Sequence, residues 1–348
     1  MNNVNIGLFD FDYDTTWAAF FLDADLNIYS RYGGRDAEAS DSRLTKNSLL
    51  QTMHEVLDVH EDRKAAGFPA DDSQTHPRLQ PDRKPEEMPL LKNNHSGCLH
   101  CHQIQEFGYL QKFHDGKFTS DDLFGFPLPE NLGIQFDRQH GHRIEKIVAD
   151  TPADGKLQPG DLITRINRVP VHSEQDVRWA LHHTSAAEAV EVTLQRPAKR
   201  QPNAEKDAAD SPTVTQKVTL KPVRKNWKHT ELGWRKSLRS VPLPLGFLGY
   251  ALGREELKRG ALPADRLAIR ITSIRGQGLS TAVGLHKGDV IIAVGDRTKA
   301  GSFEEFLSEL LHRYQPGAEV RLRVLRDGKE MGLRGRFPDW HTDDTSVP

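Results

Sequence analysis

Cysteine, net charge and long hydrophobic runs are all scarce in this sequence. Only two cysteines occur among 348 residues, which excludes a disulfide framework and favours a site that uses both thiols. The net charge at pH 7 is −2, so we expect no nucleic-acid partner. No apolar run approaches the roughly 18 residues that cross a bilayer. The sequence therefore predicts no transmembrane segment.

Motifs of serine proteases are also missing. The sequence has no Gly-x-Ser-x-Gly stretch, and the region before residue 120 is too short for a double-barrel protease that would hold a Ser-His-Asp triad. The sequence therefore favours a protein that is not an enzyme.

Signal-peptide features are absent from the start as written. Residues 1–3 carry no basic side chain, and the apolar run at 17–22 is short and follows Asp10, Asp12 and Asp14. Taken alone, these features indicate a cytoplasmic protein. A core-like strand is nevertheless expected almost at the first residue, so we expect the natural protein to have an upstream segment.

The composition indicates several small domains. The length predicts about two to three domains. Hydrophobic residues make up 36% and charged residues 28% of the chain, which favours small cores joined by solvated linkers.

The first 60 residues predict strands followed by a helix. Strands are expected at residues 5–11, 17–22 and 28–32, with a turn at 23–27. A helix is expected over 44–59, with Thr45 as its cap. Its helically spaced apolar residues are Leu49, Leu50, Met53, Val56 and Leu57.

This pattern resembles the C-terminal half of a thioredoxin-like domain, matched over residues 9–59. The redox-active half that precedes it in that family is missing, and Thr15 and Thr16 stand where the family has a cis-proline. Residues 1–60 are therefore interpreted either as a partial thioredoxin-like segment or as a cap on the neighbouring domain. Residues 61–94 are polar and mixed in charge, which predicts a flexible linker.

The segment 95–120 carries both cysteines in a Cys-x-x-Cys-His motif, with Cys98, Cys101 and His102. Four interpretations stay open. Covalent haem c would use both thiols and His102, with Met88, His95 or His114 as the opposite ligand. Thiol redox would use Cys98 and Cys101. A zinc site would add His102 and His95, and two structural cysteines would do no chemistry.

Two later stretches share one pattern, in which Gly-Asp precedes an aliphatic strand, a helix and a hairpin. Gly160-Asp161 and Gly288-Asp289 mark the two copies. The pattern resembles PDZ domains of bacterial Do-type proteases, without their protease domain. The resemblance implies PDZ domains at 121–225, with a polar insertion at 197–212, and at 240–338. The expected fold is α+β, mostly β, with two partly open barrels.

The PDZ resemblance implies peptide-binding residues in both copies. An extended protein C-terminus would add to a sheet edge, and backbone amides would cradle its carboxylate. In the first copy the residues implied are Leu132, Gly133, Ile134, Gln135 and Phe136, with Val177 and Leu181 on the facing helix. In the second they are Leu248, Gly249 and Tyr250, with Phe303, Phe306 and Leu307. Each helix residue either shapes the pocket or belongs to the core, and residues 253–264 are placed to cover the second groove.

The complete layout resembles a bacterial family of thioredoxin-like/PDZ proteins, whose members are exported. That resemblance implies an extracytoplasmic location. The sequence favours a peptide-binding adaptor with an accessory Cys-x-x-Cys-His site. The alternative is a redox protein, by haem electron transfer or thiol exchange, that docks clients through its PDZ units.

Overall fold

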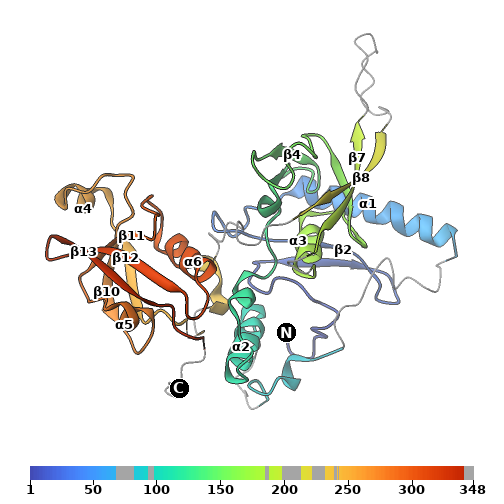
Figure 1. Ribbon diagram of the computed structural model, residues 1–348. Coiled ribbons are helices and arrows are strands. Elements are labelled where there is room, and N and C mark those ends of the chain that lie inside the picture. Colours follow the sequence, from blue (N-terminus) through green and yellow to red (C-terminus); the bar gives the residue numbers. More distant parts are fainter. Residues whose placement is uncertain are drawn as a thin grey trace, which may run out of the picture. The chain divides into compact units, whose positions relative to one another are not determined.

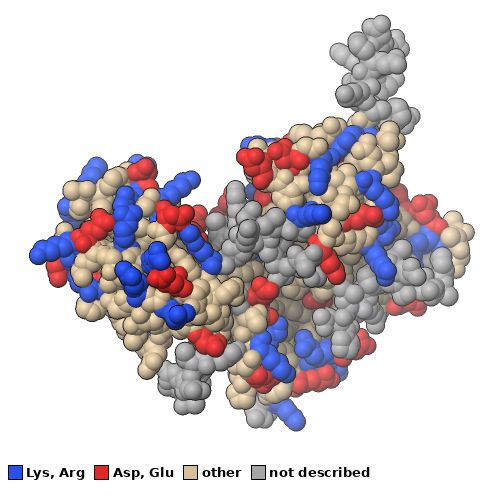
Figure 2. Space-filling view, viewed as in Figure 1, with Lys and Arg blue, Asp and Glu red and all other residues tan. Residues whose placement is uncertain are grey.

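The computed structural model describes residues 1–67, 82–92, 98–184, 188–197, 213–221, 232–238, 241 and 243–340 (Figure 1). The chain forms two compact units. The first unit consists of Met1–His102 and Gly125–Lys228, and the second of Gln103–Phe124 and His229–Pro348. Basic and acidic side chains are interspersed over the face of the molecule seen in Figure 2. No helix in the described ranges is long and apolar enough to cross a membrane.

The part of the first unit after residue 125 contains two small antiparallel sheets and a helix that closes over them. One sheet pairs β3 (Ile134–Phe136) with β4 (Ile144–Ile147), and the other has the order β6-β5-β7-β8. Its strands are β5 (Leu162–Ile166), β6 (Val169–Pro170), β7 (Val190–Pro197) and β8 (Thr213–Leu220). Helix α3 (Glu174–His182) starts at Ser173, whose hydroxyl accepts the amides of Gln175 and Asp176.

The second unit is built on one five-stranded antiparallel sheet of order β13-β12-β11-β10-β9. Its strands are β9 (Phe247–Ala251), β10 (Ile269–Ile274), β11 (Val290–Val294), β12 (Glu319–Arg326) and β13 (Lys329–Arg336). Its helices are α4 (Arg254–Arg259), α5 (Leu279–Val283) and α6 (Phe303–Arg313). The predicted α+β fold with mostly sheet is confirmed, and neither sheet system closes into a complete barrel.

The Gly-Asp pair has the same role in both units. Gly160 and Gly288 have φ angles of 89° and 95°, which glycine adopts without strain. The buried Asp161 binds Arg196 with oxygen–nitrogen distances of 2.7 and 2.6 Å. Asp289 binds Arg326 in the same way, at 2.8 and 2.7 Å. Each pair therefore joins the turn before one central strand to the hairpin beside it.

The N-terminal residues belong to the first unit. Strands β1 (Ala18–Leu22) and β2 (Ile28–Gly33) form the expected hairpin, and α1 (Lys46–Ala65) follows with Thr45 as its cap. All six residues of β2 are buried. Ser30 donates to the carboxylate of Asp176 on α3 at 2.7 Å. The hairpin thus covers α3 of the first unit.

The expected strand at residues 5–11 is wrong, because these residues form turns. The side-chain oxygen of Asn5 accepts the amides of Gly7 and Leu8 at 3.0 and 3.1 Å. This local bonding replaces a strand ladder. The run at 17–22 also differs from expectation, since β1 is only half-buried.

The expected linker at 61–94 contains ordered parts. Helix α1 extends to Ala65, and the 3-10 turn η1 (Pro85–Glu87) follows. Met88 and Leu91 are buried, and the Arg83 carbonyl accepts the amide of Ile6 at 2.8 Å. The rest of the linker, at 68–81 and 93–94, lies outside the described residues, as does 198–212 of the expected insertion.

The segment after the cysteines contributes to the second core. Helix α2 (Cys101–His114) is followed by the short turn η2 (Ser120–Phe124). The ring of Phe118 contacts those of Tyr109 and Trp340 at centroid distances of 5.9 and 5.5 Å. From residue 103 onward this segment is therefore part of the second unit rather than a separate module.

Helix α1 docks through two polar side chains and Val56, whereas three of its other apolar residues face outward. Leu50, Met53 and Leu57 are exposed, whereas Ser48 and Thr52 are buried. The Thr52 hydroxyl donates to the carbonyl of His172 at 2.9 Å. The sequence pattern alone would have placed the leucines inward.

Glu55 joins α1 to two histidines of the first unit. Its carboxylate lies 2.8 Å from Nε2 of the buried His142 and 3.1 Å from Nδ1 of His172. The Nδ1–H of His142 donates to the Ile163 carbonyl at 2.7 Å. Burial lowers the pKa of His142, but the hydrogen bond and charge of Glu55 and the Ile163 carbonyl together raise it more, so the net shift is upward. Burial raises the pKa of Glu55, but its histidine bonds lower it to about 2.

We predict that this cluster makes the stability of the first unit depend on pH. The His142 contribution is complete below the unfolded pKa of 6.5 and is lost as pH rises through the higher folded value. The Glu55 contribution is present above its unfolded pKa of 4.5 and is lost as pH falls toward the folded value. Urea denaturation should show a lower free energy of unfolding at pH 9 than at pH 6.

Glu55→Gln is the test variant, and Glu61→Gln on the same helix is its matched control. Glu55→Gln should flatten the pH dependence between 6 and 9. Glu61, whose side chain is 65% exposed beside Lys64, should leave it unchanged on substitution. An unaltered slope in Glu55→Gln would contradict the assignment.

Candidate functional site

The expected carboxylate cradle of the first unit is already engaged in local hydrogen bonds. Residues Pro129–Leu132 form the 3-10 turn η3, and Gly133 follows with a φ of 88°. The amides of Asn131 and Gly133 donate to the carbonyls of Leu128 and Glu130, both at 3.0 Å. A Cβ on Gly133 would lie 1.8 Å from the Thr151 hydroxyl. The glycine is thus required by packing, and the amides of Asn131 and Gly133 have acceptors within the turn.

The side chains expected to shape the first pocket are mostly core residues. Leu132, Ile134 and Phe136 on and before β3 are buried, while Gln135 is half-buried. Val177 and Leu181 of α3 are 0% and 2% exposed and belong to the same core. These residues therefore support the groove from beneath instead of facing a peptide.

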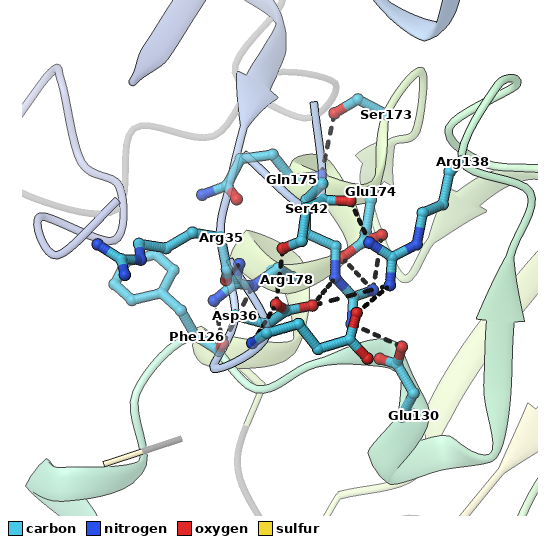
Figure 3. A network of polar contacts seen from close by, with 12 residues as sticks. Arg35, Asp36, Ser42, Phe126, Glu130, Arg138, Ser173, Glu174, Gln175 and Arg178 are labelled. Atoms are coloured by element: carbon cyan, nitrogen blue, oxygen red, sulfur yellow. Dashed lines mark hydrogen bonds and ion pairs between the residues drawn. The ribbon is translucent and has the colours of Figure 1, made fainter. Parts of the chain in front are cut away.

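Arg43 bridges the space between the first cradle and the facing helix. Its partners Asp36, Glu130 and Glu174 are labelled in Figure 3. Its guanidinium pairs with Asp36 at 2.7 Å, with Glu130 at 2.8 Å and with Glu174 at 3.0 Å. Glu130 directly precedes the cradle, and Glu174 begins α3. The Arg43 side chain is only 8% exposed.

The charges around Arg43 depend on one another. Burial and the negative charge of Glu174 raise the pKa of the Glu130 carboxyl. Burial would also raise the pKa of Asp36, but hydrogen bonds from Ser42 and Arg43 lower it overall. Arg43 therefore supplies the positive charge that offsets the repulsion among three neighbouring carboxylates.

Two further arginines bind the segment 35–43, one beside β3 and one on α3. Arg138, just after β3, donates to the Ser42 carbonyl and lies 3.1 Å from the Glu38 carboxylate. On the helix side, Arg178 donates to the carbonyls of Arg35 and Phe126, both at 3.3 Å. Residues 35–43 thus span the expected peptide position of the first unit, a role that the sequence analysis did not assign to them.

The second unit presents a different edge. Strand β9 ends the five-stranded sheet, and no strand in the described residues pairs with its outer side. Leu248 and Tyr250 are 43% and 40% exposed. Such an unpaired edge with apolar side chains is suited to receive another strand.

The start of β9 is fixed by Gly246. Its φ is 67°, and its carbonyl accepts the Arg275 amide and the Ser280 hydroxyl, both at 2.8 Å. A Cβ on Gly249 would lie 2.5 Å from the Arg270 carbonyl. Both glycines therefore allow close backbone approach at the beginning of the edge strand.

The helix beside β9 contributes both core and boundary residues. Phe247 lies 6.4 Å, ring to ring, from Phe303 and from Phe306. Phe306 is 1% exposed and belongs to the core, whereas Phe303 and Leu307 are only partly buried. Of the three helix residues expected at this pocket, Phe303 and Leu307 keep exposed surface.

The interruption at 253–264 does not pack with α6. Leu257 of α4 belongs to a small cluster with Leu252, Ala268, Val290 and Ile292. The alternate residue of β11, Ile291, faces the larger core that contains Phe306. Because successive strand residues point to opposite faces, α4 covers the face of the sheet opposite α6.

The cysteine motif lies at the beginning of α2. Cys98 is exposed, Cys101 is half-buried, and neither forms a disulfide. Burial raises the pKa of the Cys101 thiol. No three His, Cys, Asp or Glu side chains in the described part of the chain converge on a metal position. The expected zinc ligands therefore are not gathered there, and His95 lies outside the described residues.

The other ligands considered for the motif are dispersed. Met88 is buried near η1, and His114 is the last residue of α2. His114 lies twelve positions after His102 on α2, or about 18 Å further along the helix axis. One iron therefore cannot bind both histidines, and His114 is wrong as an opposite axial ligand.

Two segments of the chain match the PDZ domain family, at residues 131–206 and 246–334. A solved structure of the HtrA-type protease AlgW with a decapeptide is similar, at 26% identity over 27% of this chain and 28% of that chain, with a TM-score of 0.24. A second, of AlgW with a tripeptide, has 23% identity over 27% of this chain and 30% of that one, with a TM-score of 0.23. The chain spans less than a third of either protease structure. No curated protein matches it.

We predict that Arg43→Met destabilises the first unit by about 3 kcal/mol, because it leaves buried carboxylates without their counter-charge. The free energy of unfolding is measured by urea denaturation at pH 7. Arg138→Met is the matched control, since the Arg138 side chain is 39% exposed and should contribute less than about 1 kcal/mol. Equal, small losses in both variants would show that Arg43 is not the central ion.

Proposed function

We propose that the chain, which carries two PDZ domains in tandem, is a peptide-binding adaptor whose second domain takes extended tails along β9. The observation that carries this proposal is the unpaired outer edge of β9 together with the exposed Leu248 and Tyr250. PDZ domains bind peptides by adding them to a sheet edge. The protein C-terminus is the peptide class proposed.

In this mechanism the peptide backbone supplies the affinity and side-chain contacts supply the selection. The amides and carbonyls on the outer side of β9 pair with an antiparallel peptide strand. Phe303 and Leu307, which keep part of their surface exposed beside Phe247, would contact apolar peptide side chains. The amides of residues 247–250 are proposed to hold the terminal carboxylate.

The first domain is proposed to act as a scaffold in this adaptor. Arg43 and residues 35–43 already link its cradle to its helix. Removing that segment would leave the half-buried Glu130 and Glu174 without the Arg43 guanidinium, although Arg178 would keep Asp12. We therefore expect one peptide per chain.

A redox role of Cys98 and Cys101 is the second candidate function. The observation that favours it is an apolar cavity that Cys101 lines. Peptide binding and this role use different residues, so one does not depend on the other.

Leu248→Asp should weaken peptide binding by the full-length chain about tenfold, equivalent to about 1.4 kcal/mol. The charged side chain would be desolvated as the peptide covers β9. The probe is a labelled peptide with a free carboxylate, selected on an array of C-terminal sequences, and the readout is fluorescence anisotropy with calorimetric stoichiometry. The same peptide with an amidated C-terminus should bind more weakly.

Met331→Asp is the matched control for this experiment. Met331 is 40% exposed on β13, at the opposite edge of the same sheet, and its substitution should leave the affinity unchanged. A tenfold loss in Met331→Asp with none in Leu248→Asp would place the peptide on the other edge. Binding of two peptides per chain would contradict the scaffold role of the first domain.

A further inference from the structure

An apolar cavity of about 420 Å³ lies in the first unit. Its lining includes the aromatic side chains of Phe9, Phe11, Trp17 and Phe20, and it also includes Ala18 and Cys101. This volume falls within the range of about 300–1,000 Å³ that is usual for small-molecule sites. Its lining contains no residue of β9 and none of the Arg43 bridge.

The aromatic wall is held in place by contacts among its own rings. Phe20 meets Phe9 at a centroid distance of 5.1 Å and Phe11 at 5.7 Å, both edge to face. Phe11 also contacts Tyr13 at 4.4 Å. These contacts fix ring orientation, so the wall is formed without a ligand.

A polar atom of the lining has no hydrogen-bond partner. The Thr15 hydroxyl oxygen is buried and unpaired in the described part of the chain, and Thr15 lines the cavity. Buried hydroxyls normally have a partner, because leaving one unpaired costs about 1–3 kcal/mol. The cavity therefore suits an occupant that is largely apolar and carries polar groups.

We propose that this cavity seats a haem that Cys98 and Cys101 hold through thioether bonds, with His102 as an iron ligand. The three residues form the Cys-x-x-Cys-His pattern of covalent haem attachment. Cys101 reaches the cavity directly at the start of α2, and both cysteines are free thiols. The aromatic wall provides the apolar contact surface that a porphyrin requires.

The attachment is an addition reaction that balances without an external oxidant. Each S–H bond breaks, the sulfur bonds to the inner carbon of a haem vinyl group, and the hydrogen goes to the terminal carbon. No group leaves and no electrons are lost. A zinc ion or a local disulfide would use the cysteines but not the aromatic wall or the Thr15 hydroxyl.

The test is to produce the full chain, exported with a cleavable leader, in a bacterial host that matures c-type cytochromes. A cytochrome matured in the same host controls for haem supply. We expect haem that stays with the protein after denaturation and an intact mass increased by one haem. A colourless, folded chain beside a matured control cytochrome would overturn the proposal.

Cys101→Ala and His102→Ala test the attachment residues. Both should reduce covalent haem to background, whereas His114→Ala, which changes an exposed histidine of the same helix, should not. Circular dichroism shows whether each variant folds. Full haem content in a folded Cys101→Ala would contradict the proposed thioether.

Ala18→Leu and Ala19→Leu test the seat itself. Ala18 lines the cavity, whereas its neighbour on β1, Ala19, does not. Filling the cavity should lower haem content about fivefold or more, and the Ala19 variant should match the unmodified chain. Equal haem in both variants would place the haem outside this cavity. Peptide affinity at β9, measured on the same preparations, should not change.

Discussion

The first unit depends on partners for the charged side chains that α3 buries. Asp176 and Arg178 are 1% and 0% exposed, and buried charges are stable only when paired or hydrogen-bonded. Arg178 pairs with Asp12 at 2.9 Å, and Asp176 accepts the amide of Arg31 at 2.8 Å. The N-terminal residues therefore complete this domain.

The hairpin in turn is held by a buried cation. The Arg31 guanidinium lies 3.9 Å above the Trp179 ring, and burial lowers its pKa to about 10. This side chain remains charged at neutral pH, so the hairpin and α3 share charges that neither could bury alone. The same interactions that stabilise the first domain occupy the face on which a PDZ domain would receive a peptide. They account for the contrast with β9, where the exposed side chains of Leu248 and Tyr250 are uncharged.

Much of the fold was predictable because it depends on local patterns. The Gly-Asp turns identify both PDZ copies, since each requires a glycine with positive φ and a buried acceptor. The helix expected after the first Gly-Asp strand is α3, and the hairpin expected at 17–32 is β1 and β2. In each case residues close in sequence determine the structure.

The remaining features depend on contacts between distant residues. Arg43 and Arg178 have the sequence character of solvated side chains, and only the carboxylates brought to them by folding explain their burial. The leucines of α1 show the opposite case, since their helical spacing suggests burial but Leu50 and Leu57 are exposed. Helical spacing does not reveal which face of a helix packs against the protein. The cavity beside Cys101 likewise combines residues 9–20 with residue 101. No spacing rule connects these segments.

The assignment of residues 103–124 to the second unit means that the two units are interleaved along the polypeptide. The chain leaves the first unit after His102, returns at Gly125 and leaves again after Lys228. Neither unit is thus one continuous stretch of sequence. A fragment cut out at the PDZ boundaries would lose the Asp12 partner of Arg178 from one core and Tyr109 and Phe118 from the other. Synthesis on the ribosome must therefore reach the C-terminal strands before the helix made from residues 103–114 acquires its packing partners.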